Sequence, residues 1–283
     1  MNSEQLAWLI RRHGIEMTHI SHGSHIGSIL SVADIVAVLY NDVANVFPEN
    51  FKEENRDRIV LSKGHAGAAI YAALAEKGFF DRKELKTHYA DGSRLSGHVS
   101  HKGVPGVEFS TGSLGHGVCV AAGMALNAKI NNKAYYTYAI VGDGECDEGS
   151  IWEMALFANQ FNLNQLVVIV DHNKMQSLDF CENTLSLTPF VDKWKAFGWN
   201  VFDIDGHNHN ELYNALNAAK QSEKKPTVII ANTIKGKGIS FMEFDILWHY
   251  RFPHEGEEYD VALKELYATM PVGVSDPYEE KTK

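Results

Sequence analysis

Two apolar stretches, joined by a glycine-rich turn and a helix, constrain the fold of this chain more than any other feature. Residues 134–142 (AYYTYAIVG) have the composition of a strand, residues 148–162 (EGSIWEMALFANQFN) that of a helix, and residues 166–171 (LVVIVD) form an almost continuous apolar run. Such a run is typical of a strand that is buried on both faces of a parallel sheet. The order strand, helix, strand recurs over residues 200–233. The sequence therefore predicts the α/β class, with a mostly parallel sheet flanked by helices.

The rest of the chain predicts helices around this sheet. Apolar periodicity and composition indicate helices over residues 3–14, 31–44, 66–78 and 116–129. Ser3 is the expected cap of the first helix and Gly14 its end, and Gly78 is the expected stop of the third. Residues 58–67 read as a short strand that runs into a turn. Residues 90–117 are rich in Gly, Ser and His, and a long irregular span of this kind is usually functional.

The expected organisation is one domain over residues 1–255, followed by a helix and a charged tail over residues 256–283. We expect the tail, from residue 275 onward, to fray. The three cysteines, Cys119, Cys146 and Cys181, are scattered without a paired spacing, which suits a reducing compartment.

The charge pattern argues against several classes of partner. The 283 residues carry a formal net charge of −10, and no run of lysine or arginine marks a basic face. Nucleic acid and anionic membranes are therefore not expected partners. No apolar stretch approaches the roughly 18 residues of a membrane span, and the N-terminus lacks the pattern of a signal peptide. We expect a cytoplasmic protein.

Polar side chains follow two neighbouring strands of the predicted sheet. Asp143 lies between two glycines directly after the first strand, and Asn173 lies 30 positions later, after the next strand. The carboxyl ends of parallel strands meet at one edge of a sheet, so the two side chains are expected to lie close together. One anionic and one neutral oxygen donor suit a hard cation that shares its remaining positions with substrate phosphates. The sequence therefore predicts a Mg²⁺ site.

This Gly-Asp-Gly and Asn pattern resembles the signature of thiamine diphosphate enzymes. In that family the metal is held by the Asp, by the Asn and by a backbone carbonyl two residues beyond the Asn. The resemblance implies that Asp143, Asn173 and the carbonyl of Met175 are the metal ligands, and that the N–H of Gly144 approaches the diphosphate. It also implies the thiamine diphosphate-binding fold for residues 1–255.

Five further segments resemble, in order, the loops that build a transketolase active site. They are SHGSHIGS, LSKGHA, LSGH, STGSLGHG and KGKGISFMEFDILWH, at residues 21–28, 61–66, 95–98, 110–117 and 235–249. The resemblance covers nearly the whole chain. The cofactor contacts that it implies are His65, Leu114, Gly115, Gly144, Glu145, Asn173, Lys235 and His249. His25 and His98 are expected to face the reacting carbon and the sugar hydroxyls, where imidazole can donate or accept a hydrogen bond.

Two loops depart from the family pattern, because a proline usually follows the histidine where this chain has Ile26 after His25 and Val99 after His98. The departures affect the expected sugar preference rather than cofactor binding. Glu148 and Glu153 match acidic positions that join a carboxylate relay across the dimer interface of transketolases. The alternative is that they complement the dipole of the helix after Asp143.

Other readings of single residues stay open at this point. His19, His22 and His25 form a possible zinc cluster, although Ser- and Gly-rich sequence does not fix zinc ligands well. Lys63 and Lys102 read as solvated surface charges. His172, His207 and His209 read as loop or capping residues.

By this resemblance the chain is the thiamine diphosphate- and Mg²⁺-binding subunit of a two-subunit transketolase. Such an enzyme moves a two-carbon ketol unit from a ketose to an aldehyde, with sugars that are expected to be phosphorylated. The activating glutamate would come from a C-terminal partner subunit, with two copies of each subunit in the complex. The alternatives are the thiamine subunit of a 2-oxoacid dehydrogenase or deoxyxylulose synthase, and a non-catalytic thiamine-binding module. A dinucleotide-binding dehydrogenase is disfavoured, since no GxGxxG opens a helix after the first strand.

Overall fold

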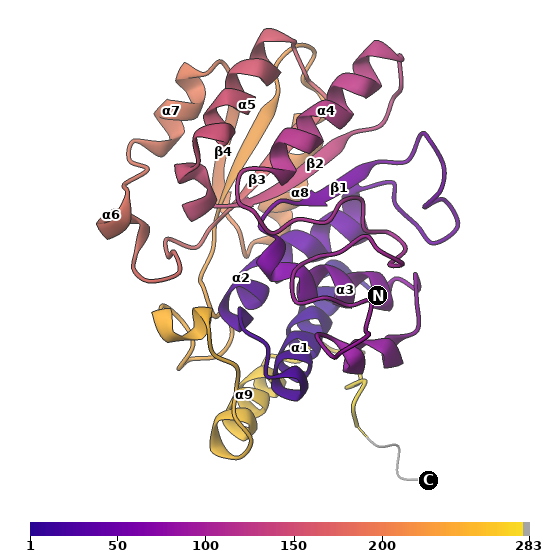
Figure 1. Cartoon of the computed structure of the whole chain (residues 1–283), viewed down its shortest axis with the longest axis vertical. Helices are drawn as coiled ribbons and strands as arrows, with labels where there is room; N and C mark the ends of the chain where they lie inside the picture. The colour runs from indigo at the N-terminus through magenta and orange to yellow at the C-terminus, as the bar shows by residue number, and fades with distance from the viewer. Residues whose placement is uncertain (280–283) are drawn as a thin grey trace.

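The central sheet is fully parallel, as the apolar strands predict. The computed structural model describes residues 1–279, in which five strands pair in the order β1-β2-β3-β5-β4 (Figure 1). The strands are β1 (Arg58–Leu61), β2 (Thr137–Gly142), β3 (Leu166–His172), β4 (Asn200–Asp205) and β5 (Thr227–Asn232). At one edge Gly142 pairs with Asp171, and His172 pairs with Asn232. The carboxyl ends of the central strands therefore lie side by side.

Helices surround this sheet. The α-helices are α1 (Ser3–Ser21), α2 (Ile26–Val38), α3 (Gly67–Glu76), α4 (Gly117–Ile130), α5 (Gly149–Gln160), α6 (Cys181–Thr184), α7 (Phe190–Ala196), α8 (His209–Ala219) and α9 (Glu257–Ala268). A π-helical turn, η1 (Leu39–Val43), continues α2. The short 3₁₀ turns are η2 (Gly64–Ala66), η3 (Arg82–Thr87), η4 (Gly144–Asp147) and η5 (Ile246–His249). Residues 88–116 contain no helix or strand, which confirms the irregular span predicted there.

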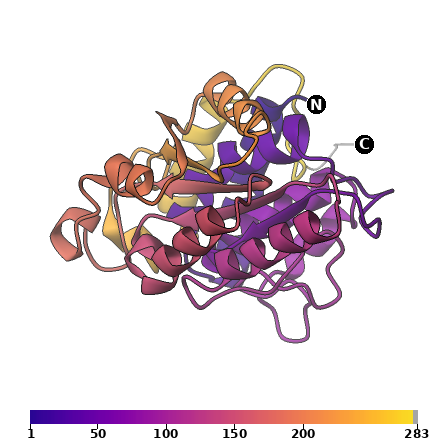
Figure 2. The ribbon, with the colours of Figure 1, turned by 90° about the horizontal axis from the view of Figure 1, so that it is seen from above.

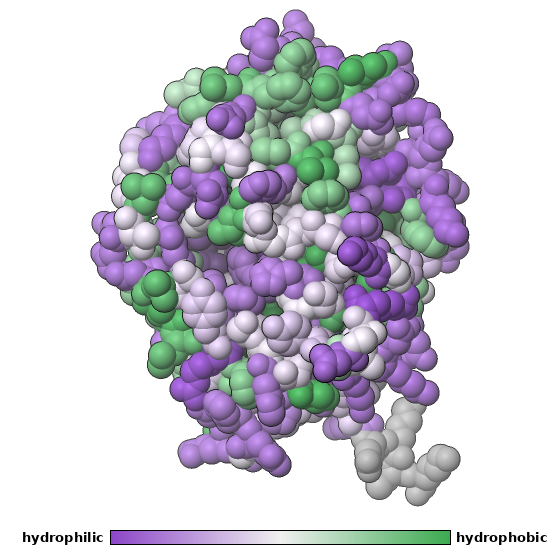
Figure 3. Space-filling view, in the orientation of Figure 1, coloured by the Kyte–Doolittle hydropathy of each residue, from purple (hydrophilic) through white to green (hydrophobic). Residues whose placement is uncertain are grey.

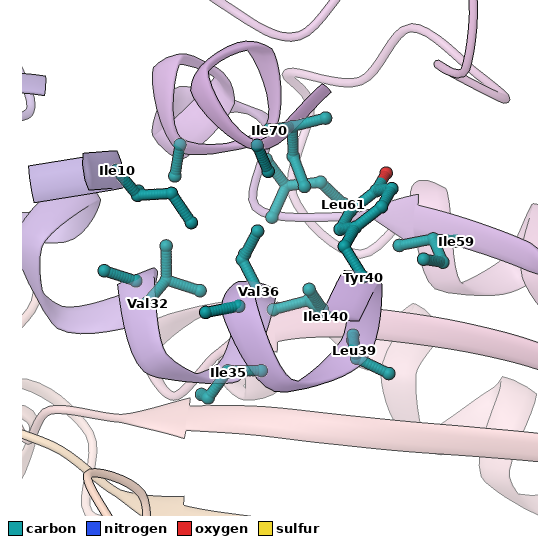
Figure 4. Packing of buried hydrophobic residues seen from close by; sticks show 14 of the residues in the cluster. Ile10, Val32, Ile35, Val36, Leu39, Tyr40, Ile59, Leu61, Ile70 and Ile140 are labelled. Carbon is teal, nitrogen blue, oxygen red and sulfur yellow. The ribbon is translucent and has the colours of Figure 1, made fainter. Parts of the chain in front are cut away.

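Both faces of the sheet are buried because successive side chains of each strand enter different cores. Val167 and Ile169 of β3 pack in the cluster that contains the buried faces of α1, α2 and α3 (Figures 2 and 4). Val168 and Val170 pack in a second cluster with α4, α5 and α7. This arrangement explains why β3 shows no polar alternation.

The N-terminal helix is longer than predicted. It is capped by Asn2 rather than by Ser3, since the Asn2 side chain accepts a hydrogen bond from the Gln5 N–H. It also continues through Gly14. A Cβ at Gly14 would lie 2.7 Å from Cγ2 of Ile29, so the missing side chain allows α1 and α2 to pack closely. Gly14 is therefore a packing residue and not a helix stop.

The second helix begins at Ile26, within the loop that was expected before residue 31. Together with its π-helical turn it gives an apolar stretch, Ile26–Val43, that is long enough to cross a membrane by length and composition alone. This corrects the expectation that no stretch approaches that length. Its residues are mostly buried inside the protein, at 83%, so it is a core helix.

The end of the described chain packs against the N-terminal helix. The indole of Trp8 donates a hydrogen bond to the carbonyl of Leu266 in α9, at 2.9 Å. Asp276 is buried, and its carboxylate lies 3.1 Å from the Arg12 guanidinium. Tyr278 contacts His13 through its hydroxyl, at 2.7 Å. Residues 275–279 are thus held in place, contrary to the expected fraying, and the rest of the tail (280–283) lies outside the described residues.

Candidate active site

A cavity of about 250 Å³ opens where the central strands end. Its walls come from the segments that follow β1, β2, β3 and β5, and from the loops around residues 25, 98 and 114. The predicted site residues that line it are His25, His65, His98, Leu114, Asp143, Gly144, Glu145, Asn173, Met175, Lys235 and His249. The fold therefore brings segments from most of the chain to one cavity.

The predicted metal ligands lie together on the wall formed by β2 and β3. Asp143 is 2% exposed, and its carboxylate accepts hydrogen bonds from the N–H groups of Gly144 and Lys174. Asn173 is 3% exposed, and its Oδ1 accepts from the Met175 N–H at 3.2 Å. Burial raises the pKa of the Asp143 carboxyl, so its ionised form is costly until a cation neutralises it.

The donor set fits a hard cation. In residues 1–279 no group of three or more His, Cys, Asp or Glu side chains is arranged to hold a metal. An ion at Asp143 would therefore be held by one carboxylate and by neutral oxygens such as those of Asn173 and Met175. This set, with positions left for phosphate oxygens, is what Mg²⁺ prefers. The fit supports the predicted ligands without showing the ion itself.

A buried ion pair lies beneath the cavity and was missed in the sequence. Nζ of Lys63 lies 2.5 Å from Oδ2 of Asp171, and both side chains are almost fully buried. The hydroxyls of Ser31 and Thr233 also donate to this carboxylate. Burial alone would raise the pKa of Asp171, but Lys63 and the hydroxyls hold it below its usual value. Lys63 is therefore a buried cation, and its reading as a surface charge was wrong.

A second lysine points at the same wall. Nζ of Lys235 lies 2.7 Å from the carbonyl oxygen of Gln176 and 2.8 Å from Nδ1 of His249. Burial, together with the charge of Lys63, lowers the pKa of Lys235 to about 8. Two lysines in one cavity repel each other, and an anion bound between them would relieve that repulsion.

Four histidine rings gather across the cavity from these lysines. The ring centroid of His25 lies 5.1 Å from that of His65, 5.6 Å from His98 and 5.0 Å from His249. His25 has a left-handed backbone (φ 77°) at the start of α2, and its N–H donates to the His249 carbonyl at 2.9 Å. Buried Nδ1 of His25 has no hydrogen-bond partner within the described chain. A polar atom of this kind is expected to meet a ligand or a water.

These histidines are neutral at physiological pH. Burial, with the nearby charges of His98 and Lys235, lowers the pKa of His25 to about 4. Burial and Lys235 lower the pKa of His249 to about 3, and burial lowers the pKa values of His65 and His98. Each ring can therefore both donate and accept a hydrogen bond.

Glu145 joins two loops of the site. It is 1% exposed, and its carboxylate accepts hydrogen bonds from the Ser62 hydroxyl and from the N–H groups of Gly115 and Gly142. Gly115 has a φ of 76°, and a Cβ there would lie 2.2 Å from Oγ of Ser150, so only glycine fits. Glu145 lines the cavity, but its contacts indicate that it positions the Gly115 loop.

Two predicted residues lie outside the cavity. Glu148 is the N-cap residue of α5 and Glu153 lies in its second turn, and both side chains are exposed. Their position is compatible with a contact between subunits or with the helix dipole. Their assigned role in a relay stays a prediction.

The alternative histidine clusters are separated in the fold. His19 bonds the carbonyl of Pro253 and stacks on Tyr259, whereas His22 stacks on Phe252. His207 and His209 both contact Asp34, at 2.6 and 3.0 Å, and neither lines the cavity at the strand ends. The cavity also contains Ser28, Gln176, Ser177 and Tyr250, which were not predicted. Gln176 and Ser177 follow the Asn173 strand end, so their position in the sequence was an available signal.

Comparison with known proteins identifies the relatives of this chain. The family model described as "Transketolase, thiamine diphosphate binding domain" matches residues 3–245. One of the two subunits of the apulose-4-phosphate transketolase of Phocaeicola vulgatus is 41% identical over 256 residues, covering 90% of each chain. The 6-deoxy-6-sulfo-D-fructose transketolase subunit SqwG of a Clostridium species is 44% identical over 225 residues, covering 80% of this chain and 82% of the relative. The transketolase structure from Campylobacter jejuni superposes with a TM-score of 0.87 at 30% identity, covering 94% of this chain but 43% of that one.

Proposed function

The chain belongs to the transketolase family, and from this premise we propose that it is the thiamine diphosphate- and Mg²⁺-binding subunit of a two-subunit transketolase. The proposed reaction moves a two-carbon ketol unit from a ketose to an aldehyde. One observation carries the proposal: a buried carboxylate, neutral oxygen donors and two buried lysines converge on the cavity where four histidines meet. The names of two relatives, which are subunits of transketolases, support the same division of the enzyme.

In this proposal the residues on the strand ends hold the cofactor's charged end. Asp143, Asn173 and the Met175 carbonyl bind Mg²⁺, and the Gly144 N–H contacts the diphosphate. Lys235, with His65 and His249, contacts the diphosphate from the opposite wall. Bound thiamine diphosphate would supply an electron sink for breaking the carbon–carbon bond next to a ketose carbonyl.

His25 and His98 then serve the sugar. Both rings are neutral, and both line the cavity on the side away from Asp143 and Lys63. A neutral imidazole can accept a proton from a sugar hydroxyl or donate one to it as the substrate is cleaved. We therefore assign His25 and His98 to the substrate rather than to the metal.

The need for a partner follows from the carboxylates in the cavity. Among the described residues that line it, the acidic side chains are Asp143 and Glu145. Asp143 belongs to the proposed metal site, and Glu145 is occupied by Ser62 and two backbone N–H groups. Neither is free to activate an aminopyrimidine ring. We propose that a partner subunit supplies that carboxylate and that the complex contains two copies of each subunit.

An apolar surface is available for such an assembly. Ile130 at the end of α4 and Leu156, Phe157 and Phe161 on or beside α5 are exposed. Hydrophobic residues are prominent over the end of the molecule where α4 and α5 lie (Figure 3). Helical faces of this kind are typical of interfaces between subunits.

Ketol transfer by the assembled pair tests the proposed function. The two subunits would be co-expressed and offered a panel of phosphorylated, sulfonated and unmodified ketoses with an aldehyde acceptor. Formation of the two-carbon-extended product supports the proposal. Absence of transfer from every donor, with the cofactor bound, would favour a non-catalytic binding module.

Replacing His98 is expected to impair turnover more than cofactor affinity. His98→Ala should lower kcat of the assembled enzyme about tenfold or more, because one lost hydrogen bond in a transition state corresponds to about 1.4 kcal/mol. Cofactor affinity, measured by calorimetry, should change little. A fall in cofactor affinity with unchanged turnover per bound cofactor would place His98 in the diphosphate site instead.

Cofactor binding is expected to take up a proton above pH 8. The pKa of Lys235 is lowered to about 8 by burial and by Lys63, and a bound diphosphate would favour the ammonium form. Below pH 8 Lys235 is charged with or without the cofactor, so no proton is taken up there. Above pH 8 binding must first protonate the lysine, so affinity should fall as pH rises.

Calorimetry at pH 8.5, in two buffers of different ionisation enthalpy, would measure this proton uptake. The Lys235→Met variant should lose the uptake and bind the cofactor more weakly. Lys102→Met, at an exposed lysine, is the matched control. Equal uptake by Lys235→Met and the wild type would assign the proton to another group.

A further inference from the structure

A small notch beside the cavity contains an unsatisfied histidine. It has room for about 30 Å³, the share of one water molecule in the liquid, and it is lined by residues that include His25, His88, Tyr89 and His98. His25 and His98 also line the main cavity, so the notch adjoins the proposed substrate position. No lysine, arginine, aspartate or glutamate of the described chain lines it.

The His88 imidazole is buried there with one nitrogen unpartnered. Its side chain is 4% exposed, and its Nδ1 faces the Ser21 hydroxyl at 3.4 Å. Its Nε2 is buried without a hydrogen-bond partner in the described chain, as is Nδ1 of His25 on the same notch. Burial lowers the pKa of His88 to about 4, so the ring is neutral and needs a hydrogen-bond partner rather than an anion.

The neighbouring backbone fixes the shape of the notch. Tyr89 has a left-handed backbone (φ 61°), and its N–H donates to the Leu95 carbonyl at 2.8 Å. A Cβ on Gly97 would lie 2.5 Å from Cε2 of Tyr89, so the ring rests against the Gly97 backbone, next to His98. A non-glycine residue with this backbone is held by its surroundings and tends to occur at functional sites.

We propose that this notch binds one uncharged hydroxyl group of the substrate, on the carbon next to the reacting carbonyl, and that His88 determines specificity for it. The inference rests on the proposed function, since it places the substrate between His25 and His98. The notch has room for a group of the size of one water, and its walls offer neutral imidazole nitrogens. A phosphate or sulfonate would meet no cation there, so those groups must lie elsewhere on the sugar.

Two donors that differ in a single hydroxyl test this assignment. Hydroxypyruvate carries a hydroxyl on carbon 3, next to its carbonyl, and pyruvate lacks it. In the assembled pair His88→Phe, which removes both ring nitrogens, should lower kcat/KM for CO₂ release from hydroxypyruvate about 10- to 100-fold relative to pyruvate. His88→Gln, which keeps a hydrogen-bonding group, should restore part of that preference.

The matched control is His101→Phe. His101 is an exposed histidine on the same loop that bonds Ser110 and lines neither cavity. It should leave the preference unchanged. Equal losses for both donors in His88→Phe, or no change, would overturn the assignment and favour a structural water in the notch. If the phenylalanine variant does not fold, His88→Leu carries the same comparison.

Binding can be followed independently of turnover. In the full chain with Mg²⁺ and thiamine diphosphate, the ¹⁵N signal of His88 Nε2 would be assigned from its loss in His88→Phe. It should shift on addition of hydroxypyruvate and not on addition of pyruvate. A signal that ignores both probes contradicts the notch, whereas a selective shift without any turnover by the pair supports the notch and contradicts the proposed function.

Discussion

Asp143→Asn is expected to abolish magnesium-dependent binding of thiamine diphosphate. Asp143 is the one carboxylate of the proposed metal set, and without a bridging cation its charge repels the diphosphate. Affinity should fall about 100-fold or more, which corresponds to about 2.7 kcal/mol. Calorimetry with and without Mg²⁺ would measure the loss. Asp192→Asn, at an exposed aspartate on α7, is the control.

The same variant separates binding from folding. Burial raises the pKa of Asp143 in the folded chain above its unfolded value. A raised carboxyl pKa favours folding at low pH, and this contribution is lost as pH rises through the folded pKa. At pH 7 the metal-free Asn variant should therefore unfold no more easily than the wild type. Wild-type cofactor affinity in a well-folded Asp143→Asn protein would remove Asp143 from the metal site.

The sheet and the strand-end residues were predictable because they depend on local patterns. The apolar runs of β2 and β3 indicate burial on both faces, and parallel strands place their carboxyl ends together. Asp143 and Asn173 follow from that rule, and the family resemblance, confirmed by the comparisons, adds the histidine loops. The structure brings these segments to one cavity, while the individual roles of the residues stay predictions.

What could not be predicted depends on distant contacts. Lys63 has the composition of a surface residue, and only the fold reveals Asp171 beside it, 108 positions away. Gly14 has the local character of a helix stop, but its role is set by the close approach of Ile29. His88 lacks a recognisable motif, and its unpartnered nitrogen becomes visible only when its neighbours are in place. In each case the environment comes from segments that the local sequence does not specify.

The isolated chain is expected to bind thiamine diphosphate without activating it. Exchange of the C2 proton of the cofactor needs a carboxylate against the aminopyrimidine ring, and both acidic residues that line the cavity have other contacts. Adding the partner subunit should accelerate exchange about 100-fold or more, which is within the range of general acid–base catalysis by one group. NMR of the bound cofactor in D₂O measures this rate without knowledge of the sugar.

Two controls make the result specific to the partner. A partner variant without its ring-contacting glutamate should assemble but leave exchange slow, which separates chemistry from docking. Asp143→Asn with the intact partner should also leave exchange slow, because the cofactor is not held. Rapid exchange in the isolated wild-type chain would show that this chain already contains the activating carboxylate. The division of the active site between two chains would then have to be abandoned, and Glu145 would become the residue to test, since it is the remaining carboxylate in the cavity.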